Sequence, residues 1–124
     1  MVVRDVADFI SERDGYPCDP SDIFLTNGAS HAIQNCLLML IHSKQDGVLL
    51  PIPQYPLYSA TITLYGGSQV HYHLNEDDGW SMSMESVRSS LEQAKKEDIR
   101  VKAIVVINPG NPTGKVSSSL RFHP

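Results

Sequence analysis

Three short segments of this 124-residue chain carry residue types that could hold a small ligand. The first, residues 26–30 (Thr-Asn-Gly-Ala-Ser), lies where a short apolar run gives way to a helical pattern. A helix that begins there offers free backbone N–H groups and a partial positive charge, Gly28 allows a tight turn, and Ser30 adds a hydroxyl. The segment predicts a phosphate site, with an ordinary turn capped by Ser30 as the alternative.

The second segment, residues 51–58 (Pro-Ile-Pro-Gln-Tyr-Pro-Leu-Tyr), follows a predicted strand over residues 47–50. In α/β sheets, ligands bind beyond the carboxyl ends of the strands. Tyr55 lies at such an end, held between Pro53 and Pro56, and a stiff aromatic side chain there suits stacking on a flat ring. The alternative is a loop tyrosine that packs on its own domain.

The third segment, residues 108–114 (Asn-Pro-Gly-Asn-Pro-Thr-Gly), is the most specific and follows the most strongly β-branched run of the chain. Two Asn-Pro steps restrict both asparagines to extended or turn geometry, so the loop could aim the Asn111 amide at a ligand oxygen. The alternative is a plain Pro/Gly turn. A nucleotide-type phosphate loop is excluded, because only three residues separate Gly110 from Gly114, Val116 follows the lysine, and two prolines remove backbone donors.

The elements that must position these segments alternate between strands and helices. The predicted helices cover residues 3–14, 32–41, 55–65 and 84–94, and the predicted strands cover residues 23–26, 47–50, 70–74 and 101–107. Gly15 ends the first helix and Ser83 caps the last. This order predicts an α/β fold with a parallel sheet, in which the continuous apolar strand 101–107 is buried on both faces.

Composition and charge exclude several classes of function. The net charge is −4 and the ten Lys and Arg residues are scattered, so no basic face for nucleic acid is expected. No apolar stretch approaches the roughly 18 residues of a membrane-spanning helix. Cys18 and Cys36 are expected as free thiols of a reducing interior, the cytoplasm or else an organelle, with a disulfide as the alternative. His71 and His73 share one strand face without a third ligand nearby, so no metal site is predicted.

Five ordered segments together resemble one family, the class I aminotransferases of pyridoxal phosphate (PLP) fold type I, and within it the alanine aminotransferases. The matching segments are residues 13–17, 23–30, 51–60, 78–80 and 105–114. The resemblance implies part of the three-layer αβα large domain of that fold, with a mostly parallel sheet. It also implies PLP as cofactor, amino-acid and 2-oxo-acid substrates with alanine as the expected amino donor, and a homodimeric parent enzyme.

The resemblance assigns roles residue by residue. Ala29 and Ser30, following Gly28, match the segment that binds the cofactor phosphate. Tyr55 matches the aromatic side chain that stacks on the pyridine ring. Asn111 matches the asparagine that hydrogen-bonds the phenolic oxygen of the cofactor and helps to hold the substrate carboxylate.

Several groups that the family's reaction needs are missing. In the family, the Schiff-base lysine, an aspartate on the pyridine nitrogen and an arginine on the substrate carboxylate all lie downstream of the Asn-Pro-Thr-Gly loop. None of the five lysines here falls in the matching motif, and Lys115 is expected as a solvated tail lysine. No catalytic residue is predicted, so the chain alone is expected to be inactive. The family also commonly has a cis bond before the proline that matches Pro112.

The sequence departs from the family pattern near Val116. We therefore expect residues 1–114 to be part of the PLP-binding large domain and residues 115–124 to be a divergent, disordered tail. The alternative function is a non-catalytic truncated product, or an interaction module that docks on a full-length aminotransferase. A sheet that stops midway leaves apolar faces and an uncovered strand edge, so low solubility or partly molten behaviour is expected.

Overall fold

The computed structural model describes residues 1–116, which divide into two compact units, Met1–Ala32 and the part from Ile33 onward. Most of the predicted tail, residues 117–124, lies outside the described residues. The division into a PLP-binding domain and a tail stays a prediction. Within the described residues, no helix is long and apolar enough to cross a bilayer.

The first unit contains helix α1, Val2–Asp14, and a 3₁₀ turn η1, Pro20–Asp22. Gly15 ends α1 in the left-handed conformation, at φ 73°, and its N–H donates to the Ser11 carbonyl. The Ser11 hydroxyl accepts a hydrogen bond from the Cys18 backbone N–H at 2.8 Å, which ties the following segment to the helix. The predicted first helix and its glycine stop are therefore confirmed.

The predicted strand over residues 23–26 is wrong. These residues pair with no strand among the described residues, and Phe24 is 87% exposed. A strand needs a neighbour to take up its backbone N–H and C=O groups, and the unit Met1–Ala32 contains none. The apolar run in the sequence identifies a candidate for burial but does not supply that neighbour.

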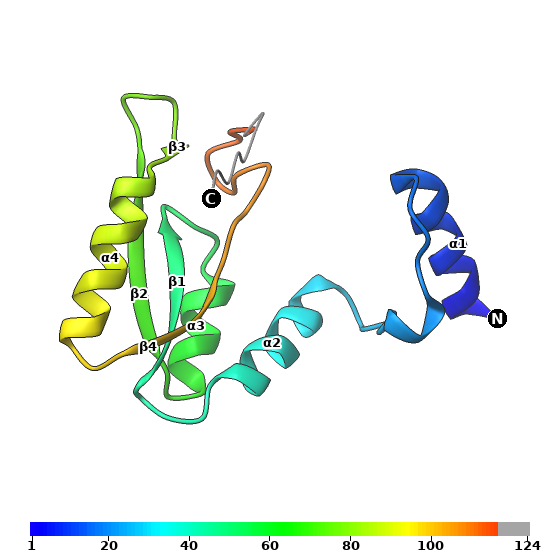
Figure 1. Ribbon diagram of the computed structural model, residues 1–124, viewed down its shortest axis with the longest axis horizontal. Helices are drawn as coiled ribbons and strands as arrows, with labels where there is room; N and C mark the ends of the chain where they lie inside the picture. The colour runs from blue at the N-terminus through cyan, green and yellow to red at the C-terminus, as the bar shows by residue number, and fades with distance from the viewer. Residues whose placement is uncertain (117–124) are drawn as a thin grey trace. The chain divides into compact units, whose positions relative to one another are not determined.

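The second unit is built on a four-stranded sheet with the order β3-β2-β1-β4 (Figure 1). Its strands are β1, Asp46–Ile52; β2, Ser68–Asn75; β3, Ser81–Met82; and β4, Arg100–Ile104. Strand β1 is parallel to β2 and β4, while the short β3 returns antiparallel to β2. The predicted, mostly parallel sheet is confirmed.

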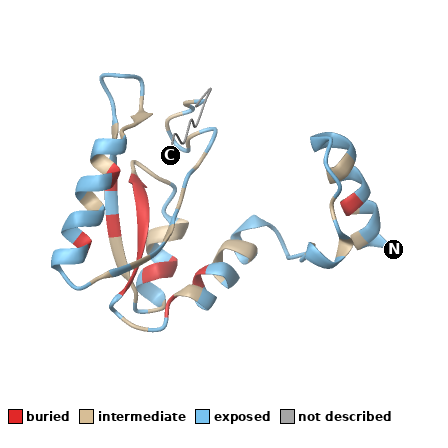
Figure 2. Ribbon diagram, in the orientation of Figure 1, coloured by how far each residue is buried: buried red, intermediate tan, exposed pale blue. Residues whose placement is uncertain are grey.

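Helices cover both faces of this sheet (Figure 1). The cluster on one face joins α2, Ala29–Leu40, and α3, Leu57–Leu64, to β1. The cluster on the other face joins α4, Met84–Lys96, to β1 and β2. Successive residues of β1 are buried on alternate faces, so β1 carries the core of both layers (Figure 2). This three-layer α/β arrangement confirms the predicted fold class.

The prediction that the strand over residues 101–107 is buried on both faces is wrong. Strand β4 ends at Ile104 instead of Ile107, and it lies at the edge of the described sheet with β1 as its one neighbour. Ile104 is 46% exposed and Val106 is 41% exposed. The apolar run predicted a central strand, but position in the sheet depends on which segments pair, and strand composition does not encode that.

The outer edge of β2 is closed by helix α4 where β3 does not reach it. The Ser86 hydroxyl accepts a hydrogen bond from the His73 N–H at 2.9 Å, and the Ser90 hydroxyl donates to the His71 carbonyl at 2.6 Å. Two serines one helical turn apart thus satisfy backbone groups that an edge strand would otherwise present for pairing. Ser83 accepts from the Ser86 N–H and is the predicted cap of α4.

Candidate functional site

The loop after β4 closes on itself. The Gly110 N–H donates to the Lys115 carbonyl at 2.8 Å, and the Gly114 N–H donates to the Gly110 carbonyl at 2.7 Å. The Asn111–Pro112 bond is cis, as the family resemblance implies. These internal hydrogen bonds use donors that a phosphate loop would need free, which supports the exclusion of that motif. Asn111 itself is exposed, so its amide is available to a ligand.

Tyr55 follows the carboxyl end of the neighbouring strand β1. It is 47% exposed and lies two residues before the start of α3. Because β1 and β4 are parallel neighbours, their carboxyl ends meet at one edge of the sheet. The structure therefore brings the segments that carry Tyr55 and Asn111 to the same edge.

The predicted phosphate segment belongs to the first unit. Gly28 has φ 84°, and a Cβ built there would meet no atom of the described part of the chain within 4 Å. The Gly28 N–H donates to the Thr26 carbonyl at 2.9 Å, which turns the chain into α2 at Ala29. Ser30 lies exposed in the first helical turn and not at the cap position. The expected turn and helix start are present, and the left-handed φ explains the glycine.

A buried tyrosine that the sequence did not single out fixes the start of the Asn111 loop. Tyr72 of β2 is 1% exposed, and its hydroxyl donates to the Val105 carbonyl at 2.8 Å, directly after β4. The Val105 N–H in turn donates to the Leu49 carbonyl at 2.8 Å. Burial raises the pKa of Tyr72 to about 12. The Tyr72 hydroxyl thus links β2, across β1, to Val105, where the segment that leads to the Asn111 loop begins.

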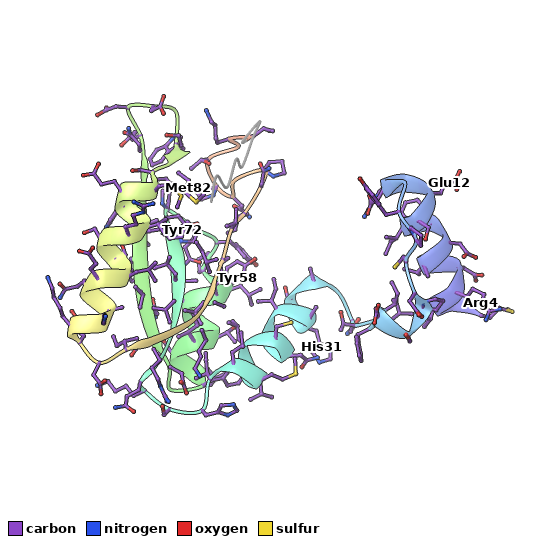
Figure 3. The ribbon with its side chains drawn as sticks, in the orientation of Figure 1. Arg4, Glu12, His31, Tyr58, Tyr72 and Met82 are labelled. Atoms are coloured by element: carbon purple, nitrogen blue, oxygen red, sulfur yellow. The ribbon has the colours of Figure 1, made fainter. Side chains whose placement is uncertain are left out.

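A small cavity of about 30 Å³ lies between this loop and the β2–β3 hairpin. Tyr72 and Met82 line it (Figure 3), together with Trp80, Asn111 and Lys115. This volume holds a water molecule or two and is far below the roughly 300 Å³ or more of a cofactor pocket. A cofactor ring near Asn111 would therefore lie outside the cavity.

The structure corrects the expectation for Lys115. It is half-buried and lines the cavity, and its Nζ lies 3.5 Å from the point where a Cβ on Gly79 would stand. The cause is the hydrogen bond from Gly110 to the Lys115 carbonyl, which folds the chain back over the β2–β3 hairpin. A sequence pattern without helix or strand periodicity gave no sign of this turn.

Comparison with known proteins decides the family. The family model described as "Aminotransferase class I and II" matches residues 2–119. The chain belongs to this aminotransferase family. The structure is also similar to a solved structure, the alanine aminotransferase from Pyrococcus furiosus, with a TM-score of 0.75 and 29% sequence identity. The match covers 92% of this chain and 27% of that protein. The resemblance stated from the sequence motifs is confirmed.

Two curated aminotransferases illustrate the range of relatives. The probable mitochondrial alanine aminotransferase of Dictyostelium discoideum is 56% identical over 115 residues. Glutamate–glyoxylate aminotransferase 2 of Arabidopsis thaliana is 51% identical over 117 residues. The alignments cover 93% and 94% of this chain but only 22% and 24% of the relatives, so the chain spans about a quarter of their length.

The lysines of this aminotransferase chain are unevenly placed in the sheet unit. Lys44 precedes β1, and Lys95 and Lys96 end α4 just before β4, all at the amino ends of the strands. Lys102 of β4 pairs with Asp46, the first residue of β1, at 3.6 Å. Lys115 is the remaining lysine, and it alone follows a strand's carboxyl end on the same side as Asn111.

Replacing Tyr72 with phenylalanine should remove the hydrogen bond that holds Val105, at the start of the segment leading to the Asn111 loop. We expect a loss of about 1 kcal/mol in the free energy of unfolding, because one partly buried hydrogen bond disappears and the carbonyl of the half-buried Val105 loses this partner. The measurement is urea unfolding followed by the fluorescence of Trp80, the single tryptophan. An unchanged unfolding midpoint at neutral pH would show that the hydrogen bond contributes nothing.

The same substitution should also change the alkaline stability. The folded pKa of Tyr72 is about 12, whereas an unfolded tyrosine titrates near about 10. Between these values the unfolded chain has lost a proton that the folded chain keeps, so the wild type loses stability as the pH rises through this window. Tyr72→Phe should lack this loss. Tyr58→Phe is the matched control, since no hydrogen bond of the Tyr58 hydroxyl is found within residues 1–116.

Proposed function

We propose that this chain is part of a PLP-dependent aminotransferase that moves an amino group between an amino acid, alanine in the first instance, and a 2-oxo acid. One observation carries the proposal: Tyr55 and Asn111 follow the carboxyl ends of two neighbouring parallel strands in a chain of the aminotransferase family. A glyoxylate-using reaction is the second substrate class, because the relatives include proteins named for both.

The residues of this chain have binding and orienting roles. Free N–H groups at the start of α2, with the Ser30 hydroxyl, would hold the cofactor phosphate. Tyr55 would stack on the pyridine ring. The Asn111 amide would donate to the phenolic oxygen and contact the substrate carboxylate. When bound, PLP supplies the electron sink for the reaction, and the protein orients it.

These residues are of the chemical types that would hold the phosphate and the ring of the cofactor, but the family's lysine, aspartate and arginine are not among them. We therefore propose that the chain by itself binds PLP without catalysing turnover. The homodimer and the cytoplasmic location remain proposals as well. The name of the Dictyostelium relative places that protein in mitochondria, so fractionation of cells should test both compartments.

PLP binding tests the proposal directly. Titration with PLP should quench Trp80, which lines the cavity beside Asn111, and the quenching should saturate. Asn111→Ala should weaken PLP binding about tenfold, the effect of one hydrogen bond to a charged oxygen. Asn35→Ala, at an exposed position of α2, is the control and should bind normally. Equal affinities of the two variants would remove Asn111 from the site.

The role of Ser30 in phosphate recognition is tested by comparing the binding of PLP with that of pyridoxal. Ser30→Ala should weaken PLP binding but leave the weaker binding of pyridoxal, which has no phosphate, unchanged. A similar loss for both ligands would show that Ser30 acts on the fold and not on the phosphate. Incubation with alanine and 2-oxoglutarate should give no turnover, and measurable transamination by this chain would refute the inactive assignment.

A second candidate function is docking on a full-length aminotransferase. The observation in its favour is the asymmetry of the sheet: α4 closes the edge of β2, while the outer edge of β4 is unpaired among the described residues. Exposed Ile104 and Val106 lie at that edge. Co-elution with a full-length alanine aminotransferase at micromolar concentration would support docking, and Ile104→Lys should abolish it. Separate elution would eliminate this function.

A further inference from the structure

Trp80, in the turn between β2 and β3, has a backbone conformation that a large side chain rarely adopts. Its φ is 66°, in the left-handed region, and the preceding Gly79 has φ 59°. Glycine enters this region without steric cost, whereas a bulky residue stays there only when its surroundings hold it. The Trp80 N–H donates to the Asn75 carbonyl at 2.6 Å, which fixes the turn. A tryptophan at a position that suits glycine indicates that its side chain makes contacts that offset the strain.

The contacts of Trp80 lie toward the segment after β4. Trp80 is half-buried and lines the small cavity between the β2–β3 hairpin and that segment, which lie side by side (Figure 1). Val106 and Asn111 line the same cavity from the opposite segment. The two segments approach closely, because a Cβ on Gly79 would stand 3.5 Å from the Lys115 Nζ. An indole ring covers a large area, so it closes this side of the cavity.

The hydrogen bonds of the Asn111 loop explain why such a wall matters. The Gly110 N–H donates to the Lys115 carbonyl and the Gly114 N–H donates to the Gly110 carbonyl, so both bonds end within the loop. They give the loop its shape but do not attach it to the sheet. Tyr72 holds the chain at Val105, before the loop begins. Packing across the cavity is a second contact, and it acts on the loop itself.

We propose that Trp80 is a positioning residue that holds the Asn111 loop against the β2–β3 hairpin. The importance of Asn111 rests on the proposed function, whereas the packing of the loop on Trp80 is measurable without a ligand. Removal of the indole would widen a cavity that has room for a water molecule or two. Water would then compete for the Gly110 and Gly114 N–H groups, and the loop would open more often.

Hydrogen exchange of single amides, followed by NMR, tests this inference. Trp80→Gly suits the left-handed backbone and removes the indole, so it separates the side chain from the strain. We expect the Gly110 and Gly114 amides to exchange faster, by on the order of tenfold more than the amides of β1. Trp80→Phe keeps an aromatic ring and should restore most of the protection. The matched control is Asp98→Gly, because Asp98 also has a positive φ, 56°, but lies between α4 and β4. It should leave the exchange of the loop unchanged.

The exchange rates decide the role of Trp80 by themselves. Unchanged or slower exchange at Gly110 and Gly114 in Trp80→Gly would overturn the inference. Equal acceleration in the loop and in β1 would also overturn it, since Trp80 would then stabilise the unit as a whole.

PLP binding, measured by equilibrium dialysis, connects the loop to the ligand. Trp80→Gly should weaken binding, and its combination with Asn111→Ala should bind no worse than Asn111→Ala alone, because Trp80 acts through Asn111. Additive losses would contradict this route. A wild type that binds no PLP would refute the proposed function, and the exchange rates would still decide whether Trp80 positions the loop.

Discussion

Replacing Asp46 with asparagine should destabilise the sheet unit more than any substitution of an exposed carboxylate. The Asp46 side chain is 2% exposed and opens the central strand β1. Its Oδ2 accepts hydrogen bonds from the His42 and Ser43 N–H groups, each at 3.0 Å. An asparagine oxygen could keep these bonds, but the amide nitrogen would then face two cations.

The second carboxylate oxygen explains why the charge matters. Oδ1 lies 3.1 Å from the Arg100 guanidinium and 3.6 Å from the Lys102 amine, both on β4. Within residues 1–116, no well-aligned hydrogen bond reaches this buried oxygen, so its interaction with β4 is that of charges. Removal of the negative charge leaves two positive groups side by side at the β1–β4 pairing. The loss should appear as faster hydrogen exchange of the β1 and β4 amides.

The effect of Asp46→Asn should depend on pH in a defined direction. The backbone hydrogen bond from His42 is the largest cause that lowers the pKa of Asp46, and the Arg100 and Lys102 charges add to it against the cost of burial. A folded pKa below the unfolded one gives stability that is present above the unfolded pKa and lost as the pH falls through the folded pKa. The difference between wild type and variant should therefore shrink below about pH 4.

Asp77→Asn is the matched control for this series. Asp77 lies exposed in the turn after β2, and its substitution should leave both the exchange rates and their pH dependence unchanged. A wild type and an Asp46→Asn variant that lose protection in parallel at every pH would show that the charge at position 46 is irrelevant to the pairing of β4.

Substitution of Gly47 by alanine should also be strongly destabilising. Gly47 is buried in β1, at the point where the register between β1 and β4 shifts. A Cβ there would stand 2.5 Å from the Ile99 Cγ2 and 3.2 Å from the Val70 Cγ2. Overpacking of this kind costs about 1–3 kcal/mol, because neighbours must leave their rotamers or the backbone must shift. Urea unfolding followed by Trp80 fluorescence gives the measurement.

A compensating substitution distinguishes overpacking from a general loss of strand structure. Ile99→Ala removes the nearest clashing methyl group, so the double variant should be less destabilised than the sum of the two single variants by about 1 kcal/mol. Additive effects in this cycle would mean that the clash with Ile99 is not the cause.

The helices and loops of this fold are largely encoded by local sequence. Gly15 ends α1, Ser83 caps α4, and the Asn-Pro steps shape the loop after β4, because each depends on the conformational preference of a few adjacent residues. The segments that carry the candidate site residues Gly28, Ala29, Ser30, Tyr55 and Asn111 were visible for the same reason. Their joint role in one cofactor site stays a prediction.

Other features could not be read from local sequence. Asp46 and Tyr72 act through Arg100, Lys102 and Val105, which lie more than thirty residues later in the chain. A lone aspartate before an apolar run, or a tyrosine between two histidines, gives no periodic signal of such a partner. Asp46 and Tyr72 stabilise the sheet only because the fold brings these distant partners next to them.

The sequence by itself determined the α/β class, most of the element types and the aminotransferase family, and it predicted the three candidate ligand-binding segments, since these depend on short-range periodicity and motif order. Only the tertiary structure decided that residues 23–26 form no strand, that β4 lies at the sheet edge, and that Lys115 lines a cavity. The physical reason is the same in each case. Strand pairing and side-chain burial depend on neighbours supplied by distant segments, and free energies of pairing are not properties of any one segment.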